Sequence, residues 1–209
     1  MRCIFLDIAS HSGIVAMVRE KEVVASREVS TRIRDHELIP LVEGLLEEVE
    51  WKYEDLTHVA CVVGPGGFTS LRVAVSFANT LIDQLEILGV GIHLSEVYFA
   101  RDSGSACLPA RQGIRNQDVF WLHATKRDSL FVKGGEWTEP TLVTLEEFKE
   151  KVPQEAQWMG ELLDEQLEEL ASKQLVQAEL KPVAKVLPQF ISQLKFTSKP
   201  LEPWYGRTG

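Results

Sequence analysis

The most informative segment of this 209-residue sequence is residues 58–81, HVACVVGPGGFTSLRVAVSFANTL. Residues 58–63 form an apolar run that predicts a buried strand, and residues 64–67 form a glycine-rich turn. A helix is expected from about Thr69 to Leu88, where Gly89 ends it. A buried strand that leads through a short turn into a helix is typical of a sheet with parallel strands.

The segments on either side extend this unit into a recognisable order. Short strand-like runs precede it at residues 3–6, 13–18 and 22–29, followed by apolar residues at helical spacing over residues 35–50. Another strand is expected at residues 90–94. The order βββαβαβ predicts a mixed sheet with three antiparallel strands and two parallel ones, as in a ribonuclease-H-like half-domain.

The second half of the chain has weaker periodicity. Strands are expected at residues 118–124, 129–133, 141–143 and 155–159, and helices at 145–151, 161–171 and 183–194. We therefore predict an α/β protein of the actin-like (ASKHA) fold, with two RNase-H-like lobes built on mixed sheets and the second lobe reduced. The expected divisions are an N-terminal lobe 1–100, a connector 101–117, a C-terminal lobe 118–197 and a tail 198–209.

Composition and charge narrow the functional classes. The chain is 44% hydrophobic and 25% charged, as in ordinary globular proteins, and has 22 basic against 31 acidic residues, a net charge of −9. Eight acidic residues lie between Asp35 and Asp55, opposed only by Lys52. This pattern disfavours binding of nucleic acid by the chain alone, because phosphate contacts need a basic surface. The first ten residues do not resemble a leader peptide, so a cytoplasmic location is expected.

The glycine-rich turn has two interpretations. An uncapped helix N-terminus can cradle an anion, which makes Gly64, Gly66, Gly67 and Thr69, together with Asp7 at the end of the first strand, candidate nucleotide or anion contacts. The turn is not a Walker loop, since no lysine occurs between Lys52 and Lys126. Alternatively, the glycines serve only close packing and positive φ angles.

The motif GPGGFTSLRVAVSFANTL at residues 64–81 resembles the GPGSFTGLRIG-type signature of the TsaB (YeaZ) family, proteins of tRNA threonylcarbamoyladenosine (t6A) biosynthesis. LDIASHSGIVAMV (6–18), RDHELIPLVEGLLEE (34–48) and LEPWYGR (201–207) are similar to further family segments. The sequence departs from the family at several points: Gly67 replaces a serine, Ser70 a glycine, Ile8-Ala9 a Thr-Ser pair, and Ala124-Thr125-Lys126 the common Asp-Ala-Arg.

The resemblance implies a protein without catalytic residues that serves as a scaffold and activator of a TsaD-type threonylcarbamoyltransferase. Its implied partners are a TsaD-like paralogue in a heterodimer, a TsaE-like ATPase, a second copy when it is alone, and tRNA only through the complex. The two helices 35–50 and 69–88 have more apolar residues than one core-facing stripe requires. The expected partner interface consists of His36, Ile39, Leu46, Val73 and Phe77.

No metal or cofactor is expected. The five histidines are 22 to 35 residues apart, so no His-x3-His pair can form on one helix. The three cysteines, Cys3, Cys61 and Cys107, suit free thiols. Two alternatives remain: a small actin-like ATPase or sugar-kinase-like enzyme that binds nucleotide at Asp7 and Gly64–Gly67, and a homodimeric interaction module.

Overall fold

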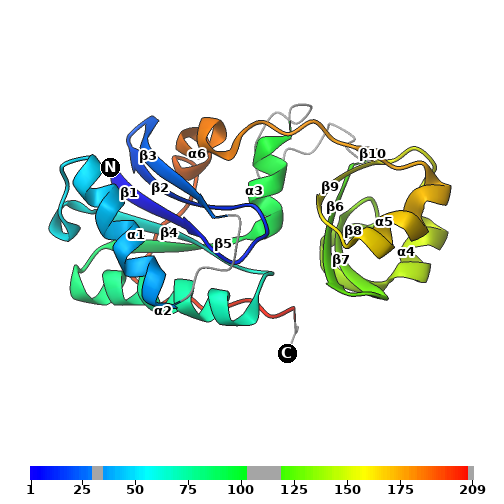
Figure 1. Cartoon of the computed structure of the whole chain (residues 1–209), viewed down its shortest axis with the longest axis horizontal. Coiled ribbons are helices and arrows are strands. Elements are labelled where there is room, and N and C mark those ends of the chain that lie inside the picture. The colour runs from blue at the N-terminus through cyan, green and yellow to red at the C-terminus, as the bar shows by residue number, and fades with distance from the viewer. Residues whose placement is uncertain (30–34, 103–118, 207–209) are drawn as a thin grey trace. The chain divides into compact units, whose positions relative to one another are not determined.

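The computed structural model describes residues 1–29, 35–102 and 119–206. The chain divides into two compact units (Figure 1). The first unit comprises Met1–Leu94 together with the segment that begins at Pro182, and the second comprises Ser95–Lys181. In the described part of the chain, no helix is both long and apolar enough to cross a membrane.

The first unit is built on a five-stranded mixed sheet. Its strands lie in the order β3-β2-β1-β4-β5. Strands β1, β2 and β3 are antiparallel, whereas β4 and β5 run parallel to β1. The predicted βββαβαβ order is therefore confirmed. The bounds are β1 (Arg2–Asp7), β2 (Gly13–Arg19), β3 (Glu22–Val29), β4 (His58–Gly64) and β5 (Leu88–His93).

Two helices cover one face of this sheet, α1 (Asp35–Glu48) and α2 (Phe68–Gln84). Alternate residues of β1, Ile4 and Leu6, share one buried core with apolar side chains from both helices. This alternation follows from the two-residue period of a strand. α2 ends at Gln84, four residues earlier than expected, because Leu88 already pairs with His58 in the parallel ladder.

The segment after Pro182 packs with the first unit, not with the C-terminal lobe and separate tail that the sequence analysis expected. Helix α6 (Val183–Ile191) contacts β2 and β3, and its apolar residues Leu187 and Ile191 are fully buried. The strong apolar stripe of α6 predicted a helix. It could not predict which sheet the helix covers.

The second unit repeats the topology of the first. Its strand order, read from the other end, is β8-β7-β6-β9-β10, with β6, β7 and β8 antiparallel and β6, β9 and β10 parallel. The fifth strand is reduced to two residues. The bounds are β6 (Val119–Lys126), β7 (Ser129–Gly134), β8 (Trp137–Thr144), α4 (Leu145–Lys151), β9 (Gln157–Glu161), α5 (Asp164–Leu170) and β10 (Val176–Gln177).

Four short elements were not predicted from the sequence: α3 (Leu94–Arg101), β10 (Val176–Gln177) and two 3₁₀ turns, Tyr53–Asp55 and Ala171–Lys173. Residues 101 and 102 of the expected connector belong to the end of α3 and to an isolated bridge between Asp102 and Leu180. The remainder of that connector, with Cys107, lies outside the described residues.

Candidate functional site

The glycine-rich turn after β4 is closely packed against other parts of the first unit. Gly64 has a φ of +144°, and a Cβ atom there would lie 2.3 Å from the carbonyl oxygen of Trp204. A Cβ atom on Gly66 would lie 2.6 Å from the carbonyl oxygen of Ala9. The amide of Gly67 donates to that same Ala9 oxygen at 3.0 Å. Close packing and backbone conformation therefore account for two of the three glycines.

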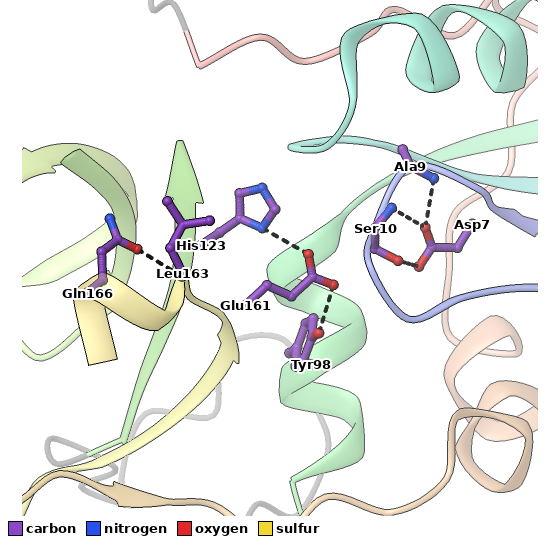
Figure 2. Close-up of polar contacts among 8 residues, drawn as sticks. All are labelled: Asp7, Ala9, Ser10, Tyr98, His123, Glu161, Leu163 and Gln166. Atoms are coloured by element: carbon purple, nitrogen blue, oxygen red, sulfur yellow. Dashed lines mark hydrogen bonds and ion pairs between the residues drawn. The ribbon is translucent and has the colours of Figure 1, made fainter. Parts of the chain in front are cut away.

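Asp7, at the end of β1, is 3% exposed and accepts hydrogen bonds from its own turn (Figure 2). Oδ1 faces the amides of Ala9 and Ser10 at 3.4 and 3.2 Å, and Oδ2 accepts from the Ser10 hydroxyl at 2.6 Å. An aspartate that satisfies the backbone two and three residues ahead is a turn-forming residue. Ser10 follows Ile8-Ala9, which stand where the TsaB family has a Thr-Ser pair. Its hydroxyl makes the shortest of these contacts.

The five candidate nucleotide or anion contacts lie in one region. Ala9 joins the Asp7 turn to the Gly66–Gly67 turn, and α2 begins immediately afterwards, with Gly67 as its N-cap. Thr69 is exposed in the first turn of α2, and that turn has no acidic side chain. The backbone carbonyls of Trp204 and Ala9 fill the space behind Gly64 and Gly66. Nucleotide binding here stays a prediction.

The expected interface residues differ in exposure. His36 is exposed and Ile39 is 49% exposed on α1, whereas Val73 and Phe77 are half-buried, one turn apart on α2, and pack against the core. Leu46 is 4% exposed and belongs to that core, so its placement on a partner-facing surface was wrong. The reason is helical geometry: Leu46 follows the fully buried Val42 by one turn, on the same face.

An exposed aromatic cluster at the start of α2 was missed by the sequence analysis. Phe68 is 60% exposed, and its ring centroid lies 5.3 Å from that of Tyr205, which is 46% exposed. The guanidinium carbon of Arg72 lies over the Phe68 ring at 5.6 Å. Phe68 precedes the expected helix start, and nothing in the local pattern predicted that the chain end would return to it.

The C-terminal segment reaches this cluster by running along β5 and α2. Gly89 and Thr197 exchange backbone hydrogen bonds at 2.7 and 2.9 Å. Further along, the Trp204 amide donates to the Val63 carbonyl oxygen at 2.7 Å, and the Trp204 ring meets the His93 ring edge-on at 4.4 Å. These contacts within the chain hold Tyr205 beside Phe68.

Within residues 1–29, 35–102 and 119–206, no group of three or more His, Cys, Asp or Glu side chains could hold a metal ion. Burial raises the pKa of the Cys3 thiol to about 12 and also raises that of Cys61. Both thiols are fully buried, as expected for small apolar residues of β1 and β4.

Two mixed five-stranded sheets of one topology, each with its crossover helices, define the class of protein: an α/β protein of the actin-like, RNase-H-like fold. Two solved structures from Pseudomonas aeruginosa share the fold. An uncharacterized protein with similarity to peptidase YEAZ aligns over 99% of both chains, with a TM-score of 0.67 at 16% identity. YeaZ aligns over 68% of this chain and 66% of its own, with a TM-score of 0.51 at 18% identity.

Sequence comparison finds similarity to proteins of tRNA threonylcarbamoyladenosine biosynthesis. The profile of "TsaD: tRNA N6-adenosine threonylcarbamoyltransferase" matches residues 23–125. The tRNA threonylcarbamoyladenosine biosynthesis protein TsaB of Escherichia coli is 28% identical over 145 residues, 68% of this chain and 62% of that protein. TsaB of Bacillus subtilis is 29% identical over 90 residues, 42% of this chain and 38% of its own length. The chain is therefore similar to proteins of the TsaB (YeaZ) family. The match to the E. coli protein spans about three-fifths of that relative's length.

Proposed function

We propose that this protein acts in t6A modification of tRNA, in the cytoplasm, as a non-catalytic scaffold and activator of a TsaD-type threonylcarbamoyltransferase. The similarity to TsaB proteins supports the pathway. The observation that supports the non-catalytic role is that the protein's own groups contact Asp7 and the glycine turn, where a nucleotide would bind. The Ser10 hydroxyl occupies one Asp7 oxygen, and the carbonyls of Ala9 and Trp204 fill the space behind the glycine turn.

The proposed partner surface is the exposed side of α1 and the adjoining flank of α2. Ile39 is an exposed large apolar residue on a helix with no Lys or Arg, and Glu43 and Glu47 beside it are exposed. Val73 and Phe77 supply a half-buried apolar flank on α2. An apolar centre with a charged rim fits a protein–protein interface. The TsaD-like paralogue would occupy it in the complex, and a second copy of this chain when the paralogue is absent; a TsaE-like ATPase would join the assembled complex.

The decisive experiment is a binding titration of the full chain with a TsaD-type protein, combined with a t6A-formation assay. The wild-type chain should bind and stimulate t6A formation. Ile39→Asp should weaken binding by at least about tenfold, or 1.4 kcal/mol, because it places a charge in a desolvated patch. Leu142→Asp is the matched control: Leu142 is 52% exposed on β8 in the second unit, outside the proposed surface.

The outcomes separate the parts of the proposal. If the wild-type chain neither binds nor stimulates a TsaD-type enzyme, the scaffold function is wrong. If it does both and Ile39→Asp behaves like the control, the function stands and the surface lies elsewhere.

The alternative ATPase or sugar-kinase-like function requires Asp7 to leave its turn and bind a metal–nucleotide complex. Isothermal titration with ATP and Mg²⁺ tests this directly: the scaffold role predicts no hydrolysis by the lone chain, and turnover that Asp7→Asn abolishes would favour the enzyme. Co-purification with a TsaD-like protein distinguishes the scaffold from a homodimeric interaction module.

A further inference from the structure

A buried polar chain lies in the second unit. It joins Tyr98 of α3, Glu161 at the end of β9 and His123 of β6, which are 5%, 6% and 6% exposed. The Tyr98 hydroxyl donates to Oε1 of Glu161 at 3.0 Å, and Nδ1 of His123 lies 3.4 Å from Oε2 of the same carboxyl group (Figure 2). One carboxylate therefore contacts both a phenol and an imidazole.

The sheet places these groups opposite one another. His123 and Glu161 are register partners in the parallel ladder of β6 and β9. Gly160, just before Glu161, has a φ of +123°, and a Cβ atom there would lie within 1.9 Å of the Leu122 carbonyl oxygen. Only glycine fits that position, so the backbone that presents Glu161 is tightly constrained.

The carboxylate of Glu161 favours one tautomer of the neutral imidazole. Nδ1 of His123 and Oε2 of Glu161 lie 3.4 Å apart without the geometry of a hydrogen bond. An ionised carboxylate only accepts hydrogen bonds, so this contact favours a proton on Nδ1. In a neutral ring the other nitrogen, Nε2, is then an acceptor. The Trp121 ring stacks parallel to the His123 ring at a centroid distance of 5.9 Å and limits its rotation. Among the described residues, Nε2 has no hydrogen-bond partner, and Figure 2 shows it pointing away from Glu161.

We propose that Glu161 is a positioning residue that fixes the tautomer of His123 and so presents Nε2 as a hydrogen-bond acceptor for a ligand group that donates one, such as a hydroxyl, an amide or an ammonium. The site lies where β9 ends, and ligands of open α/β sheets bind at the carboxyl ends of parallel strands. Tyr98 holds the second carboxylate oxygen, so the arrangement has the order phenol–carboxylate–imidazole found where a histidine must face outward in one tautomer. This inference does not depend on the proposed function.

Nitrogen-15 NMR of the histidine side chains in the full chain tests the tautomer, at about pH 8, well above the ordinary histidine pKa of about 6.5. In the wild type, the His123 signals should identify Nδ1 as protonated and Nε2 as unprotonated. Glu161→Gln keeps the shape, but its amide NH₂ can take the place of Oε2 while its carbonyl still accepts from Tyr98. The tautomer should then change to Nε2–H. Glu168→Gln, an exposed change of the same charge on α5, should leave it unchanged.

Labelling with diethyl pyrocarbonate, detected by peptide mass spectrometry, tests whether Nε2 of His123 is unprotonated and accessible to a reagent. The wild type should be labelled at His123, and Glu161→Gln should lose that label while labelling at the exposed His11 is unchanged. An Nε2–H tautomer in the wild type, or no label at His123, would overturn the proposal. If Glu161→Gln fails to fold, Tyr98→Phe serves instead: it should retain the wild-type tautomer, since the His123 contact is intact, and a changed tautomer would contradict the assigned roles.

Discussion

Asn79 of α2 and Leu201 of the C-terminal segment bond to each other twice across 122 residues of sequence. The Asn79 side-chain amide donates to the Leu201 carbonyl oxygen at 3.0 Å, and the Leu201 amide donates to Asn79 Oδ1 at 2.7 Å. The Asn79 carboxamide therefore pairs with both the N–H and the C=O of Leu201, as the backbone of a neighbouring strand would. It fixes the path that brings Trp204 and Tyr205 back to the start of α2.

Replacing Asn79 should release this segment. Asn79→Ala removes both bonds and leaves two backbone groups of a half-buried residue unpaired, so we expect a loss of about 1–3 kcal/mol in unfolding free energy. Asn79→Asp keeps the acceptor and loses the donor, and should cost less than Asn79→Ala. Hydrogen exchange at Leu201 and limited proteolysis after residue 195 would report the release. Ser76→Ala, exposed on the same helix, is the control, and equal protection of Leu201 in all three variants would contradict the assignment.

Two glycine-to-alanine substitutions should change stability in opposite directions. Gly66→Ala would place a Cβ atom 2.6 Å from the Ala9 carbonyl oxygen, so the turn must shift and the protein should be destabilised. Gly44 is exposed within α1, and a Cβ atom there would meet nothing within 4 Å. Gly44→Ala should therefore stabilise the protein by about 0.5–1 kcal/mol through helix propensity. Urea denaturation of both variants measures the difference; a stable Gly66→Ala would show that the turn is not tightly packed.

The Asp7 turn gives a further test. Ser10→Ala removes the hydroxyl that donates to Oδ2 of a buried carboxylate, and should cost about 1–3 kcal/mol, since bonds to charged groups are the stronger ones. Thermal unfolding of Ser10→Ala beside Ser12→Ala, an exposed change in the same loop, would measure it. A loss confined to Ser10→Ala supports a turn-forming Asp7, whereas equal stability of the two variants would show that the Ser10 hydroxyl does not stabilise the turn.

The local sequence pattern was sufficient to predict most of the helices and strands. Residues 22–29 and 145–151 were predicted with the bounds that β3 and α4 have, because alternation and helical spacing are properties of short segments. What failed was long-range placement. The start of α6 at Val183 was predicted correctly. The sheet against which α6 packs depends on tertiary contacts with β2 and β3, which the local sequence does not encode.

The candidate site was likewise predicted where it depends on local sequence and not where it depends on distant residues. Asp7 and the glycines were found from sequence because turns and positive φ angles have local signatures. The partners that fill the site, Ala9 and Trp204, could not be predicted, since one is an unremarkable alanine and the other lies 140 residues beyond Gly64. Leu46 was misplaced because two adjacent leucines, Leu45 and Leu46, were assigned to opposite faces when both fit one wide buried stripe.

Stability should depend on pH through His58. Partial burial, with a smaller contribution from the N-terminal positive charge, lowers the pKa of His58 below its ordinary value. The unfolded chain then binds a proton at a higher pH than the folded chain, so the unfolding free energy should be highest above about pH 6.5 and fall as the pH drops through the lowered pKa. His58→Gln should flatten this dependence, whereas His11→Gln should not. A slope in this range that is unaltered by His58→Gln would show that other groups are responsible.

Thiol accessibility provides the last test, because it depends on strand placement alone. Cys3 and Cys61 are fully buried in β1 and β4, and burial raises the pKa of both thiols, so neither reactive thiolate forms near neutral pH. Titration of the native chain with Ellman's reagent should therefore detect at most one of the three cysteines rapidly, and denaturant should release all three. Cys3 and Cys61 should react only in a slow phase, whose rate follows unfolding. Two or more thiols that react at once in the native protein would mean that the central strands are not packed as described.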